Sequence, residues 1–136
     1  MEKENKNLAF GKNLVSRLAR SKNIVTVDAQ GQSLGRLASR IAVLLQDKHK
    51  PEYAPNKAGS TFVVIENLRQ IKPFKETKLR TKIYYKHTGY IGHLKETKLA
   101  DMWEKDPVKV FKTAVRGMLP KNKLRDKRLK RLTIHI

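Results

Sequence analysis

The segment Gly31-Gln32-Ser33-Leu34-Gly35 contains the residue types of an anion-binding turn at the start of a helix. Free backbone N–H groups at a helix N-terminus attract phosphate, and glycines let a phosphate approach the backbone. The segment matches neither G-x-G-x-x-G nor G-x-x-x-x-G-K-[ST], the patterns of dinucleotide and P-loop sites. Three interpretations stay open: a plain turn in which Gly35 lets helix and sheet pack closely, an RNA phosphate contact, or a nucleotide site.

Arg36 and Arg40 lie four residues apart, on the helix face opposite the expected apolar stripe. Like charges at this spacing slightly destabilise an isolated helix, so the pair is either a solvated face or a pair of phosphate ligands. Cations at Lys109, Lys112 and Arg116 repeat the pattern on a later helix. Two helices built alike favour a coherent positive surface.

Aromatic and basic residues are interleaved in Tyr84-Tyr85-Lys86-His87-Thr88. Neighbouring side chains of a strand point to opposite sides, so one tyrosine belongs to the core and the other faces outward. We assign the outward position to Tyr85. An exposed ring beside cations is suited to an unpaired nucleotide, which needs a surface for its base and a charge for its phosphate.

No constellation of residues indicates catalysis or metal binding. His87 and His93 lack further ligands nearby, and the chain has no cysteine, so we expect neither a metal nor another cofactor. The few acids lie where turns and helix caps need them. Asp28, at a strand end, is the one candidate for general acid/base work, and we do not expect an enzyme.

The charge balance is the strongest compositional signal. Thirty-one Lys and Arg against twelve Asp and Glu give a formal net charge of +19 in 136 residues. Such charges repel one another unless a polyanion neutralises them, and nucleic acid is favoured over an anionic membrane or an acidic protein. No apolar run approaches the length of about 20 residues that spans a bilayer.

Residues 1–23 are expected to form a basic N-terminal extension without the apolar centre of a secretory signal. A mitochondrial transit peptide is conceivable, because Phe10, Leu14 and Leu18 could share a helical face. Glu2 and Glu4 oppose this interpretation, since such peptides avoid acids. We therefore expect a cytoplasmic protein in preference to an organellar one.

The remaining residues, 24–136, are expected to form a single domain that begins with a βαβ unit. A β-branched run predicts a strand over Ile24–Val27, and Ser33 is placed to cap the next helix with its hydroxyl. Helical spacing of apolar residues continues to Leu45, and the helix closes before Pro51. An apolar run at 61–65 predicts the second strand, buried on both faces.

The second half mixes basic and apolar segments. A basic stretch from Arg69 to Lys82 is interrupted by Pro73, a third strand covers 83–85, and a short helix covers 99–105. Asp106 and Pro107 predict the start of a longer helix, stopped by Gly117 and Pro120. A basic tail at 121–131 precedes a last strand at 132–136. The predicted fold class is α/β: a three-layer α/β/α domain with a mostly parallel sheet of about four strands, plus basic N- and C-terminal extensions.

Read in order, four segments resemble the bacterial form of the universal large-subunit ribosomal protein number thirteen family. They are Val27-Asp28-Ala29-Gln30-Gly31-Gln32-Ser33-Leu34-Gly35-Arg36-Leu37-Ala38-Ser39, Lys48-His49-Lys50-Pro51-Glu52-Tyr53-Ala54-Pro55, Tyr84-Tyr85-Lys86-His87-Thr88-Gly89-Tyr90-Ile91-Gly92 and Ala114-Val115-Arg116-Gly117-Met118-Leu119-Pro120-Lys121-Asn122. The resemblance runs from about Ile24 to the end of the sequence.

The resemblance implies a three-layer α/β fold, binding to large-subunit ribosomal RNA beside neighbouring ribosomal proteins, and a role in early subunit assembly. It implies neither a membrane nor a homo-oligomer. Together with the residue patterns above, it gives these expected RNA contacts: Arg36, Arg40, Lys48, His49, Lys50, Tyr85, Lys86, His87, Thr88, Gly89, Tyr90, Arg116, Lys121, Lys123, Arg125, Lys127 and Arg128. Two alternatives remain: a nucleotide-binding RNA-processing enzyme that uses the Gly31–Ser33 turn, and a nonspecific DNA-compacting protein.

Overall fold

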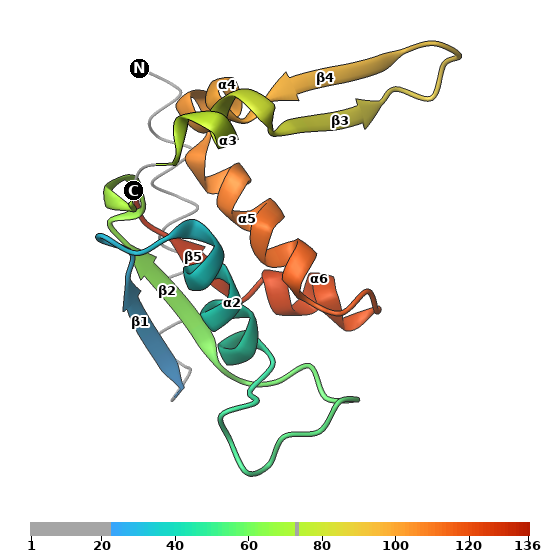
Figure 1. The fold of residues 1–136 in the computed structure, drawn as a ribbon. Coiled ribbons are helices and arrows are strands. Elements are labelled where there is room, and N and C mark those ends of the chain that lie inside the picture. The colour runs from blue at the N-terminus through green and yellow to red at the C-terminus, as the bar shows by residue number, and fades with distance from the viewer. Residues whose placement is uncertain (1–22, 73) are drawn as a thin grey trace, which may run out of the picture.

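A three-stranded parallel sheet organises the chain (Figure 1). The structure is a computed structural model that describes residues 23–72 and 74–136, so residues 1–22 of the predicted N-terminal extension and Pro73 lie outside the described residues. The strands are β1 (Ile24–Asp28), β2 (Phe62–Glu66) and β5 (Leu132–Ile134), in the order β1-β2-β5. The predicted βαβ unit is confirmed, because β1 pairs with β2 in parallel through the intervening helix α2 (Leu34–Leu45).

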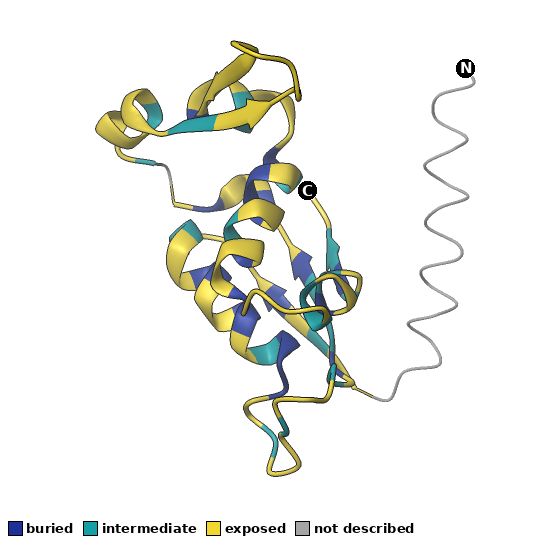
Figure 2. Ribbon diagram, turned by 90° about the vertical axis from the view of Figure 1, so that its right-hand side faces the viewer, coloured by how far each residue is buried: buried dark blue, intermediate teal, exposed yellow. Residues whose placement is uncertain are grey.

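The core forms where two amphipathic helices meet one face of this sheet. Helix α5 (Pro107–Met118) packs beside α2, and Phe111 and Val115 of α5 join Leu37 and Ile41 of α2 in one buried cluster (Figure 2). Full burial of one such side chain stabilises the fold by about 1.5–3 kcal/mol. The apolar stripes that predicted these helices are therefore the surfaces that join them to the sheet.

The predicted third layer is not formed by the described residues. Val63 and Ile65 of β2 belong to the core cluster, so Val64 between them points to the opposite face. On that face Ile24 is 43% exposed, and Val64 is only partly buried. Within 23–72 and 74–136 the arrangement is thus two layers, with α2 and α5 on the same side of the sheet.

The expectation of about four strands in one sheet is wrong for the strand predicted at 83–85. This strand, β3 (Ile83–His87), pairs antiparallel with β4 (Leu94–Lys98) in a separate hairpin. Figure 1 shows the hairpin projecting from the body of the molecule, at the end opposite the loop between α2 and β2. The Tyr-rich strand was attributed to the main sheet because β4, Leu-Lys-Glu-Thr-Lys, has no apolar alternation to reveal its partner.

Four short helices connect these parts. The basic stretch before the hairpin contains the 3₁₀ turn η1 (Leu68–Gln70) and α3 (Glu76–Thr81), neither of which was predicted. Helix α4 (Leu99–Lys105) occupies the predicted short helix. Helix α6 (Leu124–Leu129), which was not predicted, lies within the predicted basic tail. More of the basic sequence is therefore helical than its composition indicated.

The two predicted helix caps differ in outcome. Asp106 caps α5 as expected, and its Oδ1 accepts a hydrogen bond from the backbone N–H of Lys109 at 2.9 Å. Ser33 occupies the predicted position before α2, but its hydroxyl makes no capping hydrogen bond. In the plain-turn interpretation, Gly35 allows close packing of helix on sheet. This is wrong, because a Cβ at Gly35 would meet nothing within 4 Å.

Candidate nucleic-acid interface

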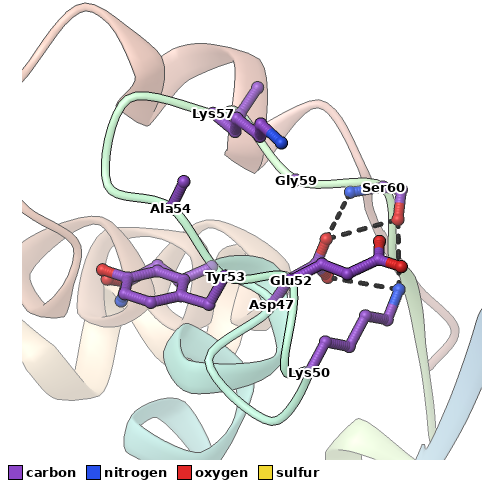
Figure 3. Close-up of a pocket in the computed structure, with 10 residues that line it drawn as sticks. Asp47, Lys50, Glu52, Tyr53, Ala54, Lys57, Gly59 and Ser60 are labelled. Carbon is purple, nitrogen blue, oxygen red and sulfur yellow. Dashed lines mark hydrogen bonds and ion pairs between the residues drawn. The ribbon is translucent and has the colours of Figure 1, made fainter.

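The loop between α2 and β2 is held in shape by the carboxylate of Asp47. Asp47 has a positive φ of 59°, an uncommon backbone conformation for a side-chain-bearing residue, and is itself buried. Its side chain accepts hydrogen bonds from the backbone N–H groups of Ser60 and Thr61. Lys50 closes the loop, with its Nζ 3.0 Å from the Ser60 hydroxyl and 3.7 Å from Asp47 Oδ1 (Figure 3).

Two arginines from the C-terminal part of the chain fix the same loop from within the protein. Arg131 Nη2 donates to the carbonyl of Leu45 at 2.8 Å and also to that of Ala58. Arg128 Nη2 donates to the carbonyl of Lys57 at 2.9 Å. The loop therefore presents its side chains from a backbone tied at both ends.

These contacts correct one predicted RNA contact. Arg128 was expected on an RNA-facing tail, but it is only 1% exposed and its guanidinium is used by loop carbonyls. Its position in α6 turns it inward, so its role in this structure is to join α6 to the loop. The sequence patterns also did not single out Arg131 or Asp47. Their partners are distant in the chain, and no local pattern signals them.

The loop displays the predicted cations unequally. Lys48 and His49 are exposed, whereas Lys50 is partly buried by its contacts with Ser60 and Asp47. Lys57, which was not predicted, is exposed on the far side of the loop (Figure 3). An open hollow lies between these two sides of the loop. Exposed lysine ammonium groups can contact phosphates, and such contacts fix the position of a protein on nucleic acid.

The carboxylate of Asp47 is ionised at neutral pH. Burial raises the pKa of Asp47, but hydrogen bonds from Thr61 and Ser60 and the charge of Lys50 together lower it below its ordinary value of 3.8. Burial also disfavours the charged form of Arg131 and so lowers its pKa, and the Asp47 charge opposes that effect. Two oppositely charged groups thus stabilise each other inside the loop.

The two long helices carry exposed cations, as predicted. Arg36 and Arg40 are exposed on α2, opposite its buried stripe. On α5, the predicted stripe lines a shallow groove that leads to Leu129 at the end of α6. Its cations are Lys109, Lys112 and Arg116. Three ammonium or guanidinium groups along one groove match the repeated negative charge of a nucleic-acid backbone.

The hairpin presents aromatic and basic groups together. Tyr84 is partly buried, with Lys82 Nζ 5.6 Å from its ring centroid, whereas Tyr85 is 61% exposed. The prediction that the two tyrosines face opposite ways is therefore confirmed, but the assignment of one of them to the core is wrong, because Tyr84 belongs to the hairpin and not to the core cluster. At the tip, Tyr90 is 74% exposed. The other predicted residues here are also exposed: Lys86, His87, Thr88 and Gly89.

The predicted basic tail is only partly an outward surface. Lys121, Lys123 and Lys127 are exposed around α6, while Arg125 is partly buried. The ends of this segment are ordered by local hydrogen bonds, including one of 3.2 Å from the backbone N–H of Leu124 to Asn122. The exposed lysines therefore project from a short helix whose inner side holds Arg128.

The turn before α2 gives little support to a nucleotide site. The backbone N–H of Gly31, which has a φ of +66°, donates to the carbonyl of Gln70 at 2.9 Å. Hydrogen bonds from the backbone N–H of Gln30 and from the Asn67 amide lower the pKa of Asp28. Asp28 thus braces the turn, with an Oδ1 that already accepts two hydrogen bonds from the protein.

Among residues 23–72 and 74–136, no three histidine or acidic side chains gather as a metal site would require. In the same residues, no helix has both the length and the apolar character needed to cross a bilayer. What the described surface offers is charge, with exposed aromatic groups on the hairpin.

Comparison with known proteins gives a consistent result over most of the chain. The family model described as Ribosomal protein L13 matches residues 22–136. A Clostridioides difficile (strain 630) protein named large ribosomal subunit protein uL13 is 49% identical over 108 residues, which are 79% of this chain and 75% of that protein. The protein of the same name from Wolinella succinogenes is 43% identical over 111 residues, covering 82% and 79% of the two chains.

Proposed function

The chain belongs to the ribosomal protein L13 family and is a protein of the large ribosomal subunit, not an enzyme; we propose that it binds large-subunit ribosomal RNA and supports early subunit assembly. The proposal places it on cytoplasmic ribosomes, beside neighbouring ribosomal proteins and without self-association. It treats residues 24–136 as the RNA-binding domain and residues 1–23 as a basic extension.

The observation that carries the proposal is the lack of internal compensation for a net charge of +19. Among the described residues, ion pairs join Lys50 to Asp47 and Arg80 to Glu76. Arg128 and Arg131 are used by loop carbonyls, whereas most of the other predicted cations, such as Arg36, Lys48 and Lys86, face solvent. Neutralising them with phosphates releases condensed counterions, which favours binding to RNA.

The arrangement of these surfaces supports contact with more than one RNA segment. The α2–β2 loop and the β3–β4 hairpin lie at opposite ends of the molecule (Figures 1 and 2). The α5 groove lies between these ends, lined by Lys109, Lys112 and Arg116. A rigid core that separates two cationic ends can hold two RNA segments at a fixed distance, which is the physical basis of a role in assembly.

The two alternatives make different predictions about ligand. A nucleotide-binding enzyme would need the Gly31–Ser33 turn, where the Gly31 N–H already has a protein partner. A DNA-compacting protein would use the same cations but would not distinguish folded ribosomal RNA from duplex DNA. Equilibrium dialysis with common nucleotides and competition with duplex DNA separate these cases from the proposed function.

The test uses the exposed lysines of the α6 region. Replacing Lys121, Lys123 and Lys127 with Gln should weaken binding to large-subunit ribosomal RNA and reduce the slope of log K against log salt by about 0.7–0.9 for each phosphate that is no longer neutralised. Replacing the same residues with Arg keeps the charge and serves as the matched control. Undiminished RNA binding by the Gln variant, with wild-type occupancy of assembled subunits, would exclude this surface.

A further inference from the structure

Lys86 and Lys95 are direct cross-strand partners in the β3–β4 hairpin, and both are exposed. Side chains of directly opposed residues have Cβ atoms about 4.5–5.5 Å apart, and like charges at such positions destabilise the pairing. We propose that this lysine pair is a clamp for one backbone phosphate of RNA. The inference rests on the proposed RNA-binding function and assigns a specific subsite to it.

The two faces of the hairpin differ in chemistry. Residues alternate between faces along each strand, so Lys86 and Lys95 share a face with Tyr84 and Thr97, which are also paired. Lys82 lies over the Tyr84 ring and adds a third ammonium group to this face. The acidic residue of β4, Glu96, is opposite Tyr85 and therefore points to the other face.

Neither clamp lysine has a carboxylate partner within the described residues. The hairpin also projects from the body, and among the described elements α3 and α4 contact β4 (Figure 1). A two-stranded hairpin is only marginally stable alone, so an uncompensated charge pair near its tip is a cost in the free protein. An anion between the two ammonium groups converts this repulsion into two attractive contacts.

The hairpin tip favours RNA over an acidic protein as the source of the anion. Beyond the clamp, Thr88-Gly89-Tyr90-Ile91-Gly92 carries no charge, and Tyr90 and Ile91 are 74% and 101% exposed. An aromatic ring near a bound phosphate can stack on an unpaired base of the same strand. A lysine pair next to an uncharged aromatic tip thus fits a nucleotide, with its phosphate at the strands and its base at the tip.

The test compares two charge reversals on the same strand. Lys95→Glu removes one clamp cation and places a carboxylate opposite Lys86, whereas Lys98→Glu makes the same charge change on the opposite face, across from Ile83. We expect Lys95→Glu to weaken binding to large-subunit ribosomal RNA by about tenfold at 0.1 M salt. Lys98→Glu should weaken it by less than about threefold.

The free protein provides a second readout with the opposite sign. Lys95→Glu replaces a repulsive cross-strand pair with an attractive one, so its thermal unfolding temperature should equal or exceed that of the wild type. Lys95→Gln removes the repulsion without reversing charge and guards against a folding defect. A variant that loses RNA affinity while gaining stability would show that the lysine pair contributes to RNA binding at a cost in the stability of the free protein.

Other outcomes identify what has failed. Equal losses of RNA affinity for Lys95→Glu and Lys98→Glu would mean that the two lysines contribute only general positive charge. This result would overturn the clamp while leaving the proposed function intact. Wild-type protein that does not bind the RNA at all would instead overturn the proposed function. If binding to poly-glutamate depended on Lys95 and binding to RNA did not, the pair would be assigned to an acidic protein partner.

Discussion

Asp47 and Arg131 meet at the backbone of Gly59: a Cβ atom placed there would lie 2.9 Å from Asp47 Oδ2 and 3.1 Å from both terminal nitrogens of Arg131. Gly59 also has a φ of +93°, which side-chain-bearing residues rarely adopt. The loop thus has a fixed point where a carboxylate, a guanidinium and a glycine backbone come together. A change to any of these three groups should therefore be felt in the stability of the protein.

Gly59→Ala should lower the free energy of unfolding by about 1–3 kcal/mol, because it combines backbone strain with a close contact to Asp47. Gly35→Ala is the matched control, since its added Cβ meets open space at an exposed position of α2. That change should raise stability by about 0.5–1 kcal/mol. Urea denaturation measures both, and equal effects of the two substitutions would contradict the structure of the loop.

Asp47 should make stability depend on pH in the acidic range. Its pKa in the folded protein lies below the ordinary 3.8, so the carboxylate stabilises the fold above that pH and the contribution is lost as pH falls through the folded pKa. Asp47→Asn should therefore be destabilised at pH 7 and approach the wild type at low pH. Urea denaturation between pH 3 and pH 7 measures this difference, with the exposed Asp101→Asn as control. A constant difference across the range would refute the assignment.

Arg128→Ala should destabilise the protein by about 1.5–3 kcal/mol, because it removes charged donors from the carbonyls of Lys57 and Ala58. Arg128→Lys should recover only part of the loss, since an ammonium group cannot reproduce the fork of a guanidinium. Lys127→Ala, exposed on the same helix, should change stability by less than about 0.5 kcal/mol. If Arg128→Ala instead weakened RNA binding without loss of stability, Arg128 would be an RNA ligand after all.

Asp106→Ala should cost about 1 kcal/mol, because the N-terminus of α5 loses its side-chain cap on the Lys109 N–H. Ser33→Ala at the equivalent position of α2 removes no capping hydrogen bond and should change stability by less than about 0.5 kcal/mol. Thermal unfolding of the two variants provides the comparison. Similar losses at both positions would mean that the Ser33 hydroxyl caps α2 in solution.

Local patterns predicted the central elements well and the peripheral ones poorly. The apolar stripes of α2 and α5 and the β-branched run of β1 each have a period that matches their structure. Strand β4 and helix α6 escaped prediction because they bury little, so their sequences carry charges in place of an apolar period. For the same reason, β3 was joined to the wrong sheet.

The candidate interface was predictable as charge and unpredictable as geometry. The sequence placed cations such as Arg36 and Lys48 on outward positions, and the structure leaves both exposed. It could not distinguish Arg128, which points inward, from its exposed neighbour Lys127. That difference depends on carbonyl groups of residues 57 and 58, which the fold brings to Arg128 across a long separation in the chain.

The long separation in sequence between the C-terminal arginines and the α2–β2 loop delays the anchoring of the loop during translation. The contact of Arg131 with Ala58 joins residues 73 positions apart, and a chain elongating at about 5–20 residues per second needs roughly 4–15 seconds to cover that interval. Until then the lysines around residue 50 have been synthesised but their backbone still lacks its anchor. A nascent chain consequently acquires this anchored cationic surface late, once Arg131, next to β5, has been synthesised.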